Sequence, residues 1–118
     1  MCSSDLGAPI EDHGSGADTR WTYLPDGAAV GIPFGALVVR DASNVLVAGR
    51  CFSATHDAHA SVRSIAQCIA MGQAAGTASA LAVGEGLDGA VRAVDVEAIR
   101  ERLADAGAIL DAPLERAA

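Results

Sequence analysis

The chain has 118 residues, which corresponds to one domain or less, and it carries a formal net charge of −7 without a single lysine. This balance argues against nucleic acid as a partner, because neutralising phosphates requires clustered lysine and arginine. No polybasic stretch is present that would hold an anionic membrane surface. Most of the apolar residues are alanine, valine and leucine, which predicts thin, closely packed layers that suit a segment packed against something else.

The amino-terminal residues and the cysteines indicate where the protein resides. Residues 1–18 contain serine, glycine and aspartate without periodicity and are expected to be a disordered or artefactual leader. They lack the charged and apolar regions of a signal peptide. Cys2, Cys51 and Cys68 show neither a metal-ligand spacing nor an even disulfide framework. We therefore expect reduced thiols in a cytoplasmic protein with no metal site.

A β pattern is predicted between residues 20 and 48. Pro25-Asp26-Gly27 has the residues of a tight turn, since proline presets φ and glycine allows a positive φ. Short strands are predicted over residues 29–32, 36–40 and 45–48. The last of these is apolar on successive residues, as in strands that are covered on both faces.

Two helices are predicted in the second half of the chain. The first runs over residues 61–83 and ends at Gly84-Glu-Gly86, and its stretch from residue 65 carries no charge. A membrane span is a rival reading of that stretch, but its recurring polar residues and missing aromatic belt favour a buried helix of a soluble protein. The second is an amphipathic helix with Asp95 as N-cap and Gly107 as terminator. Residues 111–118 are expected to be a tail.

The informative stretch runs over residues 44–81. It combines an apolar strand, Gly49, a polar loop and a helix rich in small residues. Ligands of open α/β sheets lie beyond the carboxyl ends of strands, and helix N-termini offer free N–H groups to them. A glycine at the end of the strand lets a ligand touch the backbone.

The order and spacing of several motifs in this stretch resemble the carboxy-terminal FAD-contacting segment of a family of FAD-dependent oxidoreductases. The resemblance covers roughly residues 20–110. The motifs are Val47-Ala-Gly-Arg50, Ser53-Ala-Thr-His-Asp-Ala-His59, Ser61-Val-Arg63 and Gly72-Gln-Ala-Ala-Gly76.

The resemblance implies an α/β fold: the carboxy-terminal fragment of a Rossmann-like FAD-binding domain over residues 19–110, with short strands, a long buried helix and a terminal amphipathic helix. The dinucleotide fingerprint Gly-x-Gly-x-x-Gly of such domains does not occur here. Gly84-x-Gly86 follows a helix, and Gly14-x-Gly16 follows no predicted strand. We expect that fingerprint in a missing amino-terminal part of the same enzyme, and this fragment to be inactive alone.

The resemblance also implies roles for individual residues. Gly49 and Arg50 lie where related flavoproteins meet the ribityl chain, and a surface ion pair is the alternative role for Arg50. Ser64 and Ile65 begin the helix whose N–H groups would face the pyrimidine edge of the flavin. The alternative is that they are ordinary residues of the first helical turn.

His56, His59 and Arg63 are the candidate catalytic residues, placed to bind or deprotonate the hydroxyl of a small-molecule substrate. Structural hydrogen bonding and a metal site are the alternatives, but a third metal ligand is not evident. The function implied is part of the flavin and substrate site of an FAD-dependent oxidoreductase. The alternative is a non-catalytic α/β module that binds a partner through its alanine- and glycine-rich helix.

Overall fold

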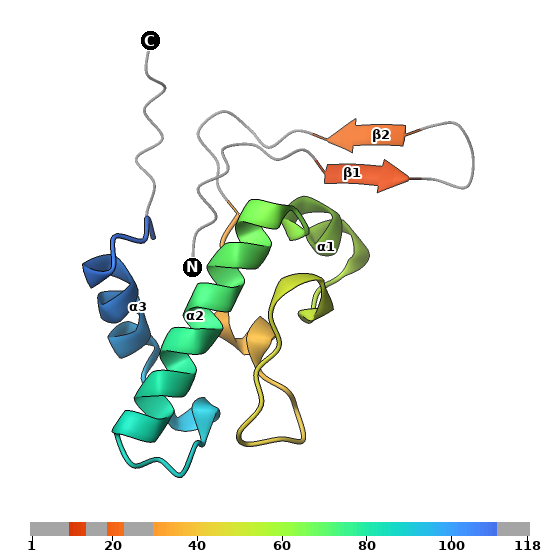
Figure 1. Ribbon diagram of the computed structural model, residues 1–118. Coiled ribbons are helices and arrows are strands. Elements are labelled where there is room, and N and C mark those ends of the chain that lie inside the picture. Colours follow the sequence, from red (N-terminus) through yellow and green to blue (C-terminus); the bar gives the residue numbers. More distant parts are fainter. Residues whose placement is uncertain (1–9, 14–18, 23–29, 111–118) are drawn as a thin grey trace.

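The computed structural model describes residues 10–13, 19–22 and 30–110. Within them lie a strand pair, three short 3-10 turns and three α-helices (Figure 1). In chain order these elements are β1 (Ile10–His13), β2 (Thr19–Thr22), η1 (Phe34–Leu37), η2 (Gly49–Cys51), α1 (His56–Val62), α2 (Ile65–Gly84), η3 (Val91–Ala93) and α3 (Val96–Asp105). The predicted turn at residues 25–27 and the predicted tail at residues 111–118 lie outside the described residues.

The prediction of a Rossmann-like α/β fold is wrong for the described part of the chain. Its regular secondary structure is mostly helical, and the only sheet there is the antiparallel pair of β1 and β2, in which Ile10 is opposite Thr22. Strand β1 falls within the residues that the sequence assigned to a leader. No parallel strands or crossover connections, which define a Rossmann-like domain, occur among the described residues.

The strands predicted at residues 36–40 and 45–48 are reduced to one antiparallel bridge between Val38 and Leu46. Pro33 precedes η1, where the N–H of Ala36 donates to the Pro33 carbonyl over 3.0 Å. This turn takes up the start of the predicted strand. Short apolar runs specify burial rather than a ladder, and a strand persists only where a neighbour pairs with it. Leu37 is accordingly fully buried without belonging to a sheet.

The predicted helix from residue 61 is split into two helices, and part of the predicted loop before it is helical. Thr55 caps α1 by accepting a hydrogen bond from the Ala58 N–H over 3.4 Å. At the other end Arg63 leaves the helical conformation, and Ser64 is extended with a ψ of 163°. The chain therefore turns between α1 and α2, and the N-terminus of α2 is a separate helix end.

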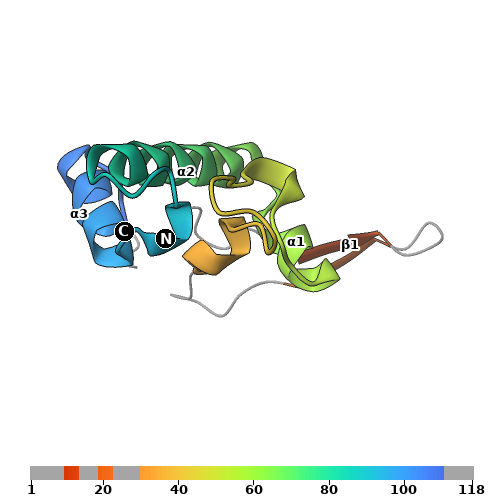
Figure 2. The ribbon, with the colours of Figure 1, turned by 90° about the horizontal axis from the view of Figure 1, so that it is seen from below.

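Helix α2 is buried along one side only, which corrects the prediction of a buried helix. Its inner face carries Gln67, Met71, Ala74, Ala78 and Ala82, at the spacing of a helix face. The opposite side is a stripe that we call the exposed stripe of α2; it consists of Ile65, Ile69, Gly72, Gly76 and Val83. Figure 2 shows the turns η1 and η3 and helix α3 on one side of α2, with η2 near one end of that helix. The small inner residues let these segments approach closely.

Helix α3 agrees with the sequence. Asp95 is its N-cap and accepts a hydrogen bond from the Glu97 N–H over 3.2 Å, and Gly107 follows the helix with a φ of +82°. Ile99 and Leu103 face the core. Helix α2 likewise ends at Gly84, as predicted. Among the described residues, no helix combines the length and apolar character needed to cross a membrane.

Candidate functional site

The candidate site lies where η2, α1 and the N-terminus of α2 meet. Gly49 opens η2 with a φ of +75°, a conformation that glycine adopts without the steric cost of a side chain. A Cβ added there would lie 4.0 Å from the Cβ and Sγ of Cys68 on α2, at ordinary contact distance. The backbone of Gly49 therefore faces the first turns of α2.

Arg50 and His59 are joined by hydrogen bonds through the backbone. The Nε of Arg50 donates to the carbonyl of Arg63 over 3.1 Å, and Nε2 of His59 lies 2.8 Å from the carbonyl of Arg50. The His59 ring stacks on Phe52 with a centroid distance of 5.3 Å and an interplanar angle of 10°. These contacts fix η2 against α1. They bring together three of the residues that the sequence selected.

A carbonyl oxygen only accepts hydrogen bonds, so the contact with Arg50 requires the proton of a neutral His59 to lie on Nε2. Nδ1 is then the nitrogen that can accept a proton. The sequence identified His59 as a candidate base, but the structure is needed to show which nitrogen would serve.

The N-terminus of α2 has no side-chain cap. Ser64 is the N-cap residue, yet its hydroxyl makes no capping hydrogen bond, and the first hydrogen bond of the helix runs from Cys68 N–H to Ser64 carbonyl at 3.0 Å. The N–H groups of residues 65–67 precede that bond and have no partner within the helix. They give this helix end a positive potential that favours an electron-rich group.

Three buried polar atoms near this helix end have no hydrogen-bond partner among the described residues: Oγ of Ser61, Oγ of Ser64 and Oε1 of Gln67. Gln67 is only 1% exposed. Buried polar groups are nearly always paired in folded proteins, so this group of atoms indicates a place where a polar ligand or water completes the structure. Ser61 belongs to the motif Ser61-Val-Arg63, but the sequence assigned no role to it. Gln67 was not selected, and its only signal was a polar residue within a run of small and apolar ones.

The remaining candidates lie at the edges of this site. His56 is the first residue of α1 and is exposed. Ile65 is the first residue of α2 and its side chain is 74% exposed, so its contribution to the site is its backbone N–H. No group of three or more His, Cys, Asp or Glu that could hold a metal ion occurs in the part of the chain that the structure describes.

A glycine in the left-handed region beside an uncapped N-terminus of a long helix is typical of proteins that bind a nucleotide cofactor. The chain matches the model of the FAD dependent oxidoreductase family over residues 6–103. Because this match covers most of the 118 residues, the chain belongs to the FAD-dependent oxidoreductase family. A search of curated proteins and a search of solved structures each found no match.

The family assignment made from the sequence is thereby confirmed, and so is FAD as the cofactor of the family. The residues at the junction fit the flavin end of such a cofactor. Unpaired N–H groups at α2, the unpartnered Oγ of Ser64 and the open backbone of Gly49 offer donors and close approach. The roles of the individual site residues stay predictions.

Proposed function

We propose that this chain forms part of the flavin and substrate site of an enzyme that moves a hydride or two electrons between a small organic substrate and FAD. The observation that supports it most is the junction of η2, α1 and α2, where a left-handed glycine, an uncapped helix end and unpartnered polar atoms occur together. When bound, FAD supplies the two-electron chemistry.

In this proposal the chain holds the flavin through its backbone. The N–H groups at the start of α2, from Ile65 onward, would donate to the pyrimidine edge of a bound flavin, and the dipole of this helix would favour negative charge there. Gly49 would allow the ribityl chain close to the backbone. Arg50 would donate to ribityl or pyrophosphate oxygens with the N–H groups that its bond to Arg63 does not use.

His56, His59 and Arg63 are proposed to act on the substrate. His59 accepts the proton of a substrate hydroxyl at Nδ1, because its Nε2 is engaged with the carbonyl of Arg50. The stacking on Phe52 keeps the ring in one orientation during that transfer. Arg63, at the turn between α1 and α2, would orient an electronegative group of the substrate.

The exposed stripe of α2 is proposed to pack against the rest of the FAD-binding domain, which carries the glycine fingerprint for the pyrophosphate. Ile65, Ile69 and Val83 are exposed by 74%, 67% and 73%, which is unusual for large apolar side chains on one helix face. Alone, the chain would then be inactive. A non-catalytic module that docks a different partner on the same stripe is the alternative, and bound flavin in the assembled protein distinguishes the two.

The free thiols of Cys51 and Cys68 support a reducing, cytoplasmic setting.

The test replaces Gly49 with valine in the protein that joins this chain to the glycine-fingerprint portion. Gly107→Val is the matched control, because Gly107 has a similar positive φ, +82° against +75°, but lies beyond α3. Both variants carry the same backbone strain. We expect Gly49→Val to lose bound flavin, measured by the flavin absorbance per protein, and Gly107→Val to keep it. Equal flavin content in the two variants would contradict the proposal.

A further inference from the structure

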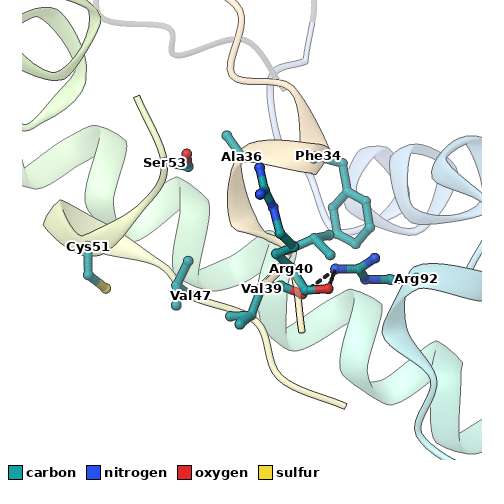
Figure 3. A pocket seen from close by; sticks show the side chains of 10 residues that line it. Phe34, Ala36, Val39, Arg40, Val47, Cys51, Ser53 and Arg92 are labelled. Carbon is teal, nitrogen blue, oxygen red and sulfur yellow. Dashed lines mark hydrogen bonds between the residues drawn. The ribbon is translucent and has the colours of Figure 1, made fainter. Parts of the chain in front are cut away.

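A second concave site adjoins η2 and shares no lining residue with the flavin junction. It is an open cavity of about 740 Å³ between η1, η2 and η3. Its apolar lining includes Phe34, Val38 and Val47, and the polar groups are supplied by Arg40, Arg92 and Ser53. Figure 3 shows Phe34 and Val47 on opposite sides of the Arg40 side chain. Neither of the candidate histidines nor Arg63 lines it.

The cavity is cationic in an acidic protein. Two of the eight arginines line it, and no acidic residue in the described part of the chain does. Arg40 is exposed, and it forms no ion pair with a described acidic residue, including Asp41, which follows it in the chain. Figure 3 shows the Arg40 guanidinium directed toward Ala36 and away from Arg92. Its donors are therefore available at the cavity.

Arg92 holds the cavity in shape. Its Nη2 donates to the carbonyls of Val39 and Arg40, which fixes η3 against the segment that carries Arg40. A backbone hydrogen bond from the Val91 N–H to the Ser43 carbonyl, 2.9 Å long, adds to this attachment. The Arg92 charge is thus held next to Arg40 by backbone oxygens, and no carboxylate of the described residues forms an ion pair with it.

We propose that this cavity binds a small organic carboxylate whose apolar body lies against Phe34, Val38 and Val47. Arg40 pairs with the carboxylate in the two-pronged geometry that guanidinium groups favour, and the Ser53 hydroxyl can donate a further hydrogen bond. The field of Arg92 adds attraction without direct contact. Binding at this site does not require flavin. A result that contradicts the carboxylate site therefore leaves the proposed redox function unaffected, and the reverse also holds.

The test measures binding of phenylacetate to the chain by ligand-observed NMR, with phenylacetamide as the uncharged probe of the same shape. Arg40→Gln is compared with Arg102→Gln, which makes the same charge change at an exposed position of α3 outside the cavity. We expect Arg40→Gln to weaken phenylacetate binding roughly 10- to 100-fold, the loss of one hydrogen-bonded charge pair. Arg102→Gln should leave it unchanged. Every comparison uses protein in the same association state, checked by sedimentation velocity, and with the same helix content, checked by circular dichroism.

Three results would overturn the proposal. Equal affinity for phenylacetamide would remove the role of the carboxylate. An equal loss in Arg102→Gln would show that only the net charge matters. If inorganic phosphate or ADP displaced bound phenylacetate as strongly as added phenylacetate does, the cavity would be a phosphate site whose apolar residues do not contribute to binding.

Discussion

The exposed stripe of α2 makes the first prediction, which concerns how the chain behaves alone and with its proposed partner. We replace Ile65, Ile69 and Val83 together by serine. Full burial of one such side chain contributes about 1.5–3 kcal/mol. These side chains are about 70% exposed, with individual values of 74%, 67% and 73%. Covering all three would therefore contribute about 3–6 kcal/mol to association, which is roughly two to four powers of ten in affinity.

We expect the unaltered chain to self-associate when isolated and to retain no FAD, and the serine variant to stay dispersed. Sedimentation velocity measures the association state of the unaltered chain and of the serine variant. With the glycine-fingerprint portion present, the unaltered chain should become soluble and bind flavin, whereas the serine variant should bind that portion far more weakly. Serine and isoleucine have similar helix propensities, so α2 itself should persist.

The matched control replaces Val45, Val96 and Ile109 by serine; among the described residues, these are the large exposed apolar residues outside α2. These are scattered over the surface and should matter little for association. The reasoning is refuted if the isolated, unaltered chain is a monomer that keeps FAD through gel filtration. It is also refuted if the control changes association as much as the serine variant of α2 does.

Two further predictions concern single residues. In the flavin-loaded enzyme, His59→Ala should reduce turnover by about a hundredfold to ten-thousandfold with flavin still bound, because it removes the proposed general base. Unchanged turnover in steady-state assays would show that His59 only makes its structural hydrogen bond to Arg50. Leu37→Ala should lower the free energy of unfolding by about 2–5 kcal/mol in urea titrations, because Leu37 is fully buried. A decrease in the free energy of unfolding of only a fraction of this value would indicate that Leu37 faces solvent, as alternate residues do in a strand that is buried on one face.

Features that depend on neighbouring residues were predictable from the sequence. The cap at Asp95 and the glycine that follows α3 were placed correctly, because capping is decided by side chains within three or four residues of the helix end. The end of α2 at Gly84 was found for the same reason. The family and its cofactor were also accessible, since they follow from the order of short motifs along the chain.

Features that depend on distant partners were not predictable. Residues 36–40 and 45–48 have the composition of strands, yet only the Val38–Leu46 bridge pairs them, because a ladder requires a neighbour in register and apolar composition specifies only burial. The residue pattern placed the helix from residue 61 and missed the break at Ser64, because serine is compatible with a helix interior and with an N-cap alike. The family resemblance had the helix begin at Ser64 and Ile65, where α2 does begin.

The candidate site divides in the same way. The sequence by itself determined which residue types are available: a glycine after an apolar run, two histidines, and arginines on either side of them. Only the tertiary structure decided that His59 reaches the carbonyl of Arg50, that Gln67 is buried without a partner, and that Arg40 and Arg92 share a cavity. Arg40 and Arg92 are 52 positions apart in the chain. Packing of the whole chain brings such residues together, and no local preference of either one encodes that proximity.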